Sequence, residues 1–151
     1  MRDQVTVHME ASPAEVWALV SDVTRIGEFS PETFEAEWLD DADGPAVGAR
    51  FRGHVKRNGK GPIYWSPCEV TECEPERVFA FAVGSASRPI NTWRYELAPA
   101  EGGGTDVTES FELAPALPMK VYWTLFGWAR GKTNREGMRT TLERIKAVVD
   151  A

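Results

Sequence analysis

Hydrophobic and polar side chains alternate along most of the chain, and this alternation predicts an antiparallel sheet. Residues 4–11, QVTVHMEA, show the alternation that is typical of a half-buried strand. The same pattern returns in six further segments, at 33–41, 49–57, 63–75, 77–84, 91–99 and 106–113. We therefore expect about seven strands, with one face of the sheet repeatedly aromatic and the other repeatedly charged.

Two short helices are expected between the first and second strands. Ser12 is suited to the N-cap, Pro13 to the first helical position and Glu15 to the third, which together form a capping box. A second short helix is predicted in VTRIGEFSPE, residues 23–32, and Pro31 should end it.

The C-terminal part of the chain has the period of an amphipathic helix. Met138, Leu142, Ile145 and Val149 recur at spacings of four, three and four, which predicts a helix from about 134 to 150. Thr133 and Glu136 would form its capping box. A sheet with one apolar face needs a cover, and we expect this helix to supply it.

The segment VYWTLFGW, residues 121–128, precedes that helix and is apolar nearly all round. Such a segment is either buried in the wall of a cavity or exposed as a contact surface for a partner. We expect it to control access to the apolar face, forming a mouth together with Ile26, Phe29 and the loop at 84–91.

A carboxylate stands on the apolar face of the strand DVTESFEL, residues 106–113. Glu109 shares that face with Val107, Phe111 and Leu113. One interpretation is structural: Glu109 pairs with Arg130 or Arg135 or with helix N–H groups, or a bulge turns it outward. The other is functional, in which Glu109 is a polar group inside an apolar cavity, with a pKa raised by desolvation and with acid or base capacity.

Composition and charge narrow the class of protein. The net charge of -6 and pI near 5.0 argue against an extended nucleic-acid surface. We expect no signal peptide, because MRDQVTVHME has no apolar core, and no apolar stretch approaches the roughly 20 residues that span a bilayer. We predict a single cytoplasmic domain over residues 1–151, of unknown oligomeric state.

The residues that commonly carry chemistry form no familiar catalytic or metal pattern. His8 and His54 fall on outward faces by parity, and no Ser-His-Asp set is visible. Cys68 and Cys73 are five residues apart on one strand, so we expect them on opposite faces, unable to form a disulfide. We expect no metal site and no cofactor.

Several motifs at matching spacing resemble the START-like (SRPBCC) superfamily, in its polyketide cyclase/dehydrase branch. They are ASPAEVWALVSDVTRIGEFSPE, VGARFRG, CEVTECEPERVFAF, TWRYEL, GGTDVTESFEL and NREGMRTTLERIK. The resemblance implies an α+β helix-grip fold, in which a curved antiparallel sheet of about seven strands wraps around a long C-terminal helix. It also implies a deep cavity between sheet and helix, where relatives bind lipids, sterols, polyketides, plant hormones or isoprenoid quinones.

The resemblance implies that the inward side chains line the cavity. The candidate ligand-binding residues are Phe29, Phe34, Trp38, Phe51, Val55, Tyr64, Ser66, Cys68, Phe79, Phe81, Trp93, Tyr95, Glu109, Phe111, Tyr122, Trp123 and Phe126. Glu109 and Tyr95 are the candidate catalytic residues, and Asn91 is a further polar candidate.

Three functions remain open at this point. The first is binding of a largely apolar small molecule that is polyketide, lipid or quinone-like. The second is a polyketide cyclase or dehydratase with Glu109 as acid or base. The third is an interaction module in which residues 121–128 make transient contact with a protein or a membrane surface.

Overall fold

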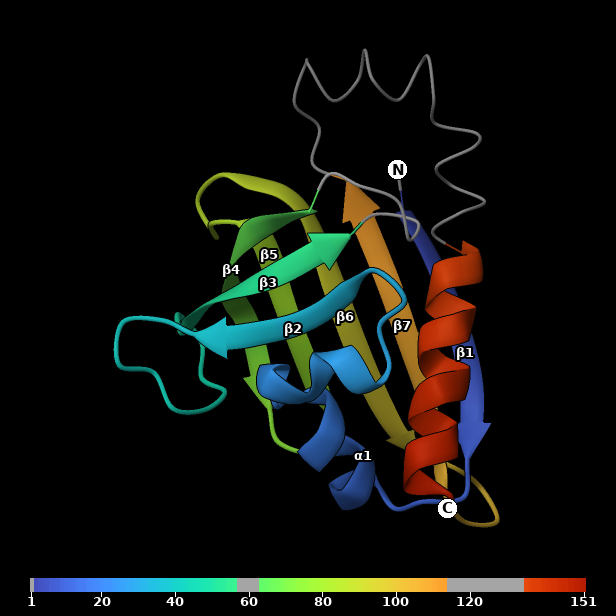
Figure 1. The fold of residues 1–151 in the computed structure, drawn as a ribbon. Helices are drawn as coiled ribbons and strands as arrows, with labels where there is room; N and C mark the ends of the chain where they lie inside the picture. Colours follow the sequence, from blue (N-terminus) through green and yellow to red (C-terminus); the bar gives the residue numbers. More distant parts are fainter. Residues whose placement is uncertain (1, 57–62, 114–134) are drawn as a thin grey trace.

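The computed structural model describes residues 2–56, 63–113 and 135–151 (Figure 1). In chain order, its elements are β1 (Arg2–Met9), α1 (Pro13–Val20), the 3-10 helix η1 (Val23–Glu28), β2 (Thr33–Trp38), β3 (Arg50–Lys56), β4 (Ile63–Glu74), β5 (Val78–Gly84), β6 (Pro89–Pro99) and β7 (Thr105–Leu113). The C-terminal helix runs over residues 135–149.

The strands form one antiparallel sheet in the order β1-β7-β6-β5-β4-β3-β2. Adjacent strands in the sheet are consecutive in the chain in every pair except β1 with β7. The sheet is therefore built almost entirely of hairpins. The sheet curves, and the C-terminal helix lies across its concave face while α1 and η1 close one end (Figure 1). The predicted helix-grip fold is confirmed.

The C-terminal helix buries the stripe that its sequence predicts. Met138, Leu142 and Ile145 are fully buried in the same cluster as the inward side chains of the sheet. The end of the helix is also tied to the link between β1 and α1, because the Asp150 carboxylate accepts the N–H groups of Glu10 (3.0 Å) and Ala11 (2.9 Å). The Thr133 half of the predicted capping box lies outside the described residues.

The first helix begins as its sequence predicts. The Ser12 hydroxyl oxygen accepts the backbone N–H of Glu15 at 3.3 Å and caps α1. The apolar side chains Val16, Leu19 and Val20 are then buried against the sheet. The second predicted helix is present as the 3-10 turn η1, which Asp22 caps by accepting the N–H of Thr24 at 3.1 Å.

Two strand irregularities change which side chains face inward. The register between β2 and β3 shifts between Thr33 and Glu35, which turns Phe34 outward against the ring of His54, with ring centroids 4.4 Å apart. Phe34 is 45% exposed. The prediction that Phe34 faces the cavity is therefore wrong, because simple alternation fails at a bulge.

The second irregularity lies in β4, where the register with β5 shifts between Val70 and Glu72. Cys68 pairs with Val83 and Cys73 with Phe79, and these partners share the inner face of β5. The two cysteines therefore share a face, against the prediction of opposite faces. Both are free thiols, as expected.

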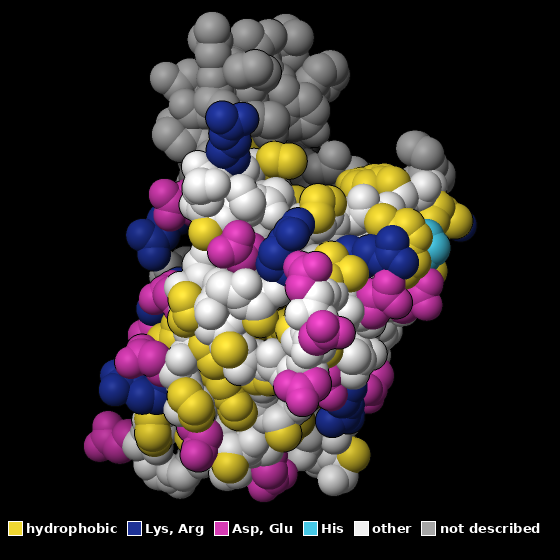
Figure 2. Space-filling model, turned by 90° about the vertical axis from the view of Figure 1, so that its left-hand side faces the viewer, with side chains coloured by type: hydrophobic (Ala, Val, Ile, Leu, Met, Phe, Trp, Pro, Cys, Tyr) yellow, Lys and Arg dark blue, Asp and Glu magenta, His cyan; other side chains and the backbone are white. Residues whose placement is uncertain are grey.

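The outer face of the sheet carries charged side chains in cross-strand pairs. Arg94 donates to Glu72 at 2.9 Å and to Glu96 at 2.6 Å, and Arg52 donates to Glu37 at 2.6 Å. Figure 2 shows acidic and basic side chains interspersed over the visible face, with hydrophobic side chains gathered beside a histidine. Among the described helices, none is long and apolar enough to cross a membrane.

Candidate functional site

A cavity of about 130 Å³ lies between the concave face of the sheet and the C-terminal helix. Eight of the predicted residues line it: Phe51, Val55, Ser66, Cys68, Phe81, Trp93, Tyr95 and Glu109. They come from β3, β4, β5, β6 and β7, so the cavity spans most of the sheet. Met138 and Thr141 on the C-terminal helix close the opposite side.

The space in the sheet wall comes from small side chains at one cross-strand position. Gly53 on β3 pairs directly with Ser66 on β4, and both line the cavity. A Cβ atom at Gly53 would stand 3.0 Å from the Thr33 methyl group, so even an alanine would crowd this wall. The small pair leaves a hollow between larger aromatic neighbours.

Three predicted lining residues belong to the packed core instead. Phe79 packs edge-on against Trp17 with ring centroids 6.2 Å apart, and Phe111 packs against Trp93 at 4.8 Å. Phe29 is almost fully buried and does not stand at a mouth. All three rings belong to the buried core cluster, and none of them lines the cavity.

The other predicted residues lie beside the cavity or outside the described chain. Trp38 packs edge-on against Phe51 at 5.7 Å without lining the cavity. Alternation along β4 places Tyr64 on the inner face. It is nevertheless 42% exposed, because it is the second residue of this strand. Tyr122, Trp123 and Phe126 fall in a segment outside the described residues.

Glu109 is the most deeply buried carboxyl group of the cavity, with 3% of its surface exposed. Burial raises its pKa from 4.5 to about 8, and a hydrogen bond from the Tyr95 side chain opposes this rise. Its Oε1 atom has no hydrogen-bond partner among the described residues. Arg135 pairs with Asp3 at 2.8 Å, so the predicted pairing of Arg135 with Glu109 is wrong; Arg130 lies outside the described residues.

Tyr95 stands directly across from Glu109 in the pairing of β6 with β7. Burial raises the pKa of its hydroxyl well above the ordinary value, and the neighbouring Glu109 carboxyl raises it further. The phenol therefore stays protonated at neutral pH and keeps a proton to donate. Glu109 and Tyr95 form a neighbouring pair of proton-bearing groups inside an otherwise largely apolar cavity.

Asn91 adds a second polar position on β6. Its Oδ1 atom is buried and has no hydrogen-bond partner among the described residues. Asn91 and Tyr95 lie on the same face of the strand, roughly 13 Å apart along it, with Trp93 between them. The cavity thus offers polar groups at two separated places.

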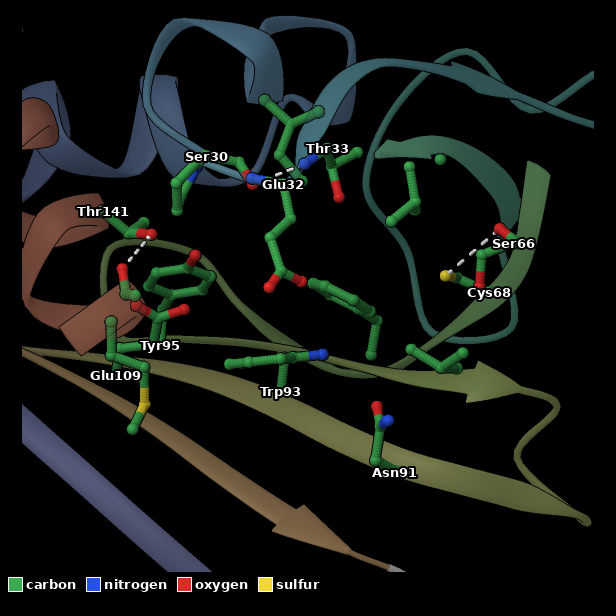
Figure 3. A pocket seen from close by; sticks show the side chains of 18 of the residues that line it. Ser30, Glu32, Thr33, Ser66, Cys68, Asn91, Trp93, Tyr95, Glu109 and Thr141 are labelled. Atoms are coloured by element: carbon green, nitrogen blue, oxygen red, sulfur yellow. Dashed lines mark hydrogen bonds between the residues drawn. The ribbon is translucent and has the colours of Figure 1, made fainter. Parts of the chain in front are cut away.

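The turn between η1 and β2 supplies a group of lining residues that the sequence pattern did not predict. The Ser30 hydroxyl accepts the N–H groups of Glu32 (3.3 Å) and Thr33 (3.0 Å), which shapes this turn over the cavity. Figure 3 shows the Glu32 side chain reaching from this turn toward Trp93 and Tyr95 on β6. A turn has no periodicity from which an inward direction can be read, which is why Glu32 was missed.

The remaining reactive side chains have little part in this site. Burial raises the pKa of the Cys68 thiol to about 12, so it is a weak nucleophile at neutral pH. His8 is exposed, and His54 stacks on Trp65 at 4.1 Å on the outer face. Within the described ranges, no three His, Cys, Asp or Glu side chains gather in a way that would hold a metal ion.

The comparison with protein families agrees with this architecture. Residues 3–150 match the family described as polyketide cyclase / dehydrase and lipid transport. The chain therefore belongs to this family, whose members share the START-like fold. No curated protein matches the chain significantly.

Solved structures show the same fold. The Polyketide_cyc-like protein Cgl2372 from Corynebacterium glutamicum is 29% identical, with a TM-score of 0.61, over 99% of this chain and 88% of that one. Protein NE0264 from Nitrosomonas europaea is 15% identical, with a TM-score of 0.68, over 97% and 92% of the two chains. Protein CV1439 from Chromobacterium violaceum is 18% identical, with a TM-score of 0.66, over 100% and 99%.

Proposed function

We propose that this protein binds a largely apolar small molecule in the cavity between its sheet and its C-terminal helix. One observation carries the proposal. Glu109 Oε1 and Asn91 Oδ1 are the buried side-chain atoms of the described residues that lack a partner, and both residues line this cavity. Buried polar atoms are almost always hydrogen-bonded, so a ligand is the natural partner for both.

Polyketide, lipid and quinone-like molecules are the ligand classes that family membership favours. The cavity limits how much of such a molecule enters. A dry cavity of about 150 Å³ holds a benzene molecule in another protein, and the cavity here is about 130 Å³. One compact ring or a short chain therefore fits, and a larger ligand must displace side chains or leave part of itself outside.

Native mass spectrometry of the purified protein tests this proposal through co-purified ligand. A titration that follows tryptophan fluorescence tests it with added ligands, because Trp93 lines the cavity. Glu109→Gln should weaken binding of a hydroxyl- or carbonyl-bearing ligand by roughly 1–3 kcal/mol. Glu112→Gln is the matched control, because Glu112 is exposed on the same strand. Equal affinity in both variants would contradict the role of Glu109.

A second function has a specific observation in its favour. With a pKa of about 8, Glu109 holds a proton at neutral pH, and the Tyr95 hydroxyl lies across from it. These are the groups that a polyketide cyclase or dehydratase needs for proton transfer. A rate profile that is bell-shaped in pH, and that loses one limb in Glu109→Gln, would support catalysis. A profile that the substitution leaves unchanged would exclude Glu109 as the acid or base.

The third function, an interaction module, depends on residues 121–128, which lie outside the described residues. It stays a prediction. Substitution of Trp123, Phe126 and Trp128 by serine should abolish association with a partner or with lipid vesicles if this segment is the contact.

A further inference from the structure

We propose that the cavity selects an amine: a compact apolar molecule whose ammonium group pairs with Glu109 among the aromatic rings of the wall. This inference rests on the proposed binding function and narrows it to one chemical class of ligand.

The charge of the lining favours a cation. The buried carboxyl group of Glu109 lines the cavity, and the described lining residues include no Lys, Arg or His. When Glu109 is ionised, a carboxylate-bearing ligand would meet like charge there, whereas an ammonium group would meet opposite charge. The negative charge of the ionised Glu109 carboxyl therefore discriminates between ligands that share the same apolar body.

The unsatisfied atoms favour a hydrogen-bond donor. Glu109 Oε1 and Asn91 Oδ1 are both oxygen atoms, and both are buried without a partner in the described structure. The Asn91 amide oxygen accepts hydrogen bonds and does not donate them, and Glu109 Oε1 does the same once the carboxyl group has lost its proton. An ammonium group has three N–H donors and complements the ionised Glu109 carboxyl directly.

Glu109 also lacks a counter-charge in the described structure. Its cross-strand neighbours are Val5 on β1 and Tyr95 on β6. The nearby helix residue that sequence suggested as a partner, Arg135, is held by Asp3. A buried carboxylate needs a cation close by to ionise at low cost, and a ligand is free to bring one.

The aromatic side chains of the wall favour the same ligand. Phe51, Phe81, Trp93 and Tyr95 all line the cavity, and Phe51 packs edge-on against Phe81 with centroids 5.1 Å apart. The electron-rich faces of aromatic rings attract cations, most strongly where water is excluded. The rings and the Glu109 carboxyl group together suit a molecule with an apolar body and one ammonium group.

Binding of an ammonium ion should release a proton from Glu109. The carboxyl group holds its proton at neutral pH because burial raises its pKa to about 8. It gives that proton to solvent when the cation arrives, and the ligand keeps its own. Glu32, Cys68 and Tyr95 are the other titratable groups in the described lining. Amine affinity should therefore rise with pH until Glu109 is ionised.

Three probes of similar size test the inference: benzylamine, benzyl alcohol and benzoate, which carry different polar groups on the same aromatic ring. Their dissociation constants are measured by NMR chemical-shift titration at about pH 7. Benzylamine should bind at least roughly tenfold more tightly than either of the others. Between about pH 6 and pH 8 its affinity should rise at least roughly tenfold, while that of benzyl alcohol stays constant.

Glu109→Gln should remove the preference for benzylamine, and Glu112→Gln should retain it. The pH series uses the wild-type protein, so it tests the inference even if the Glu109 variant folds poorly. Equal or tighter binding of benzyl alcohol or benzoate would overturn the amine assignment and leave the proposed binding function standing. An amine preference that survives Glu109→Gln would also overturn it. Failure of all three probes to bind would contradict both proposals.

Discussion

Replacing Glu109 by glutamine should stabilise the protein at neutral pH. In the folded state, burial raises the pKa of this carboxyl from 4.5 to about 8. The folded protein therefore holds a proton that the unfolded chain has already lost. The protonated Glu109 carboxyl makes its full contribution to the free energy of unfolding below about pH 4.5. This contribution is lost as the pH rises toward and through 8.

The size of this effect follows from the two pKa values. Each pKa unit of difference corresponds to about 1.4 kcal/mol. Glu109 therefore costs the folded state roughly 3 kcal/mol at pH 7 and roughly 5 kcal/mol well above pH 8. Glutamine cannot ionise, but its amide N–H groups are poorly matched here, at a cost of about 1 kcal/mol. The net gain for Glu109→Gln at pH 7 is roughly 2 kcal/mol.

Urea denaturation between about pH 5 and pH 9 measures this directly. The free energy of unfolding of Glu109→Gln should exceed that of the wild type by an amount that grows up to pH 8 and then levels off. Glu112→Gln, on the outward face of the same strand, should follow the wild type. Stabilisation by loss of a functional group is the usual sign of a site that trades stability for function.

Two results would refute this reasoning. Parallel curves for the wild type and Glu109→Gln would mean that Glu109 titrates at its ordinary pKa, in a wet environment. A loss of about 3–5 kcal/mol in Glu109→Gln across the whole pH range would indicate a buried ion pair that the substitution breaks. Either result would also remove the support for a cation-selective cavity.

Two further predictions test the packing. Phe79→Ala should lower the free energy of unfolding by about 3–5 kcal/mol, because Phe79 is buried. Phe34→Ala should lower it by less than about 1 kcal/mol, because Phe34 is exposed. Equal losses in the two variants would contradict the outward direction of Phe34. Gly104→Ala should lower stability by more than about 1 kcal/mol, because the new Cβ would stand 2.3 Å from the Met9 carbonyl oxygen. Gly102→Ala, with a similar positive φ but open space, should cost less in the same denaturation assay.

Much of the fold was predictable because α1, the C-terminal helix and most of the strands have amphipathic patterns. The seven strands, the cap of α1 and the buried stripe of the C-terminal helix all follow from periodicity and capping residues. The inward position of Glu109 followed as well, since β7 is regular throughout. In a regular strand, successive side chains point to opposite faces, so the positions of its neighbours predict the face of each residue.

The boundary between packed core and cavity was decided only by the tertiary structure. Phe79 and Phe81 share one strand face, yet the first packs against Trp17 and the second lines the cavity. Periodicity assigns a side chain to a face, but the distance to the opposite layer depends on the curvature of the sheet and on where α1 packs.

The two bulges and the Ser30–Thr33 turn were likewise beyond the reach of the sequence pattern. A single extra residue breaks the alternation between the two sides of a bulge, so Phe34, at the bulge in β2, and Cys73, beyond the bulge in β4, do not lie on the faces that alternation predicts. Glu32 lies in a turn and reaches the cavity because η1 and β2 are held together over its mouth. Alternation is a local property of the backbone, whereas a cavity is formed by segments that meet only when the whole sheet has curved around its helix.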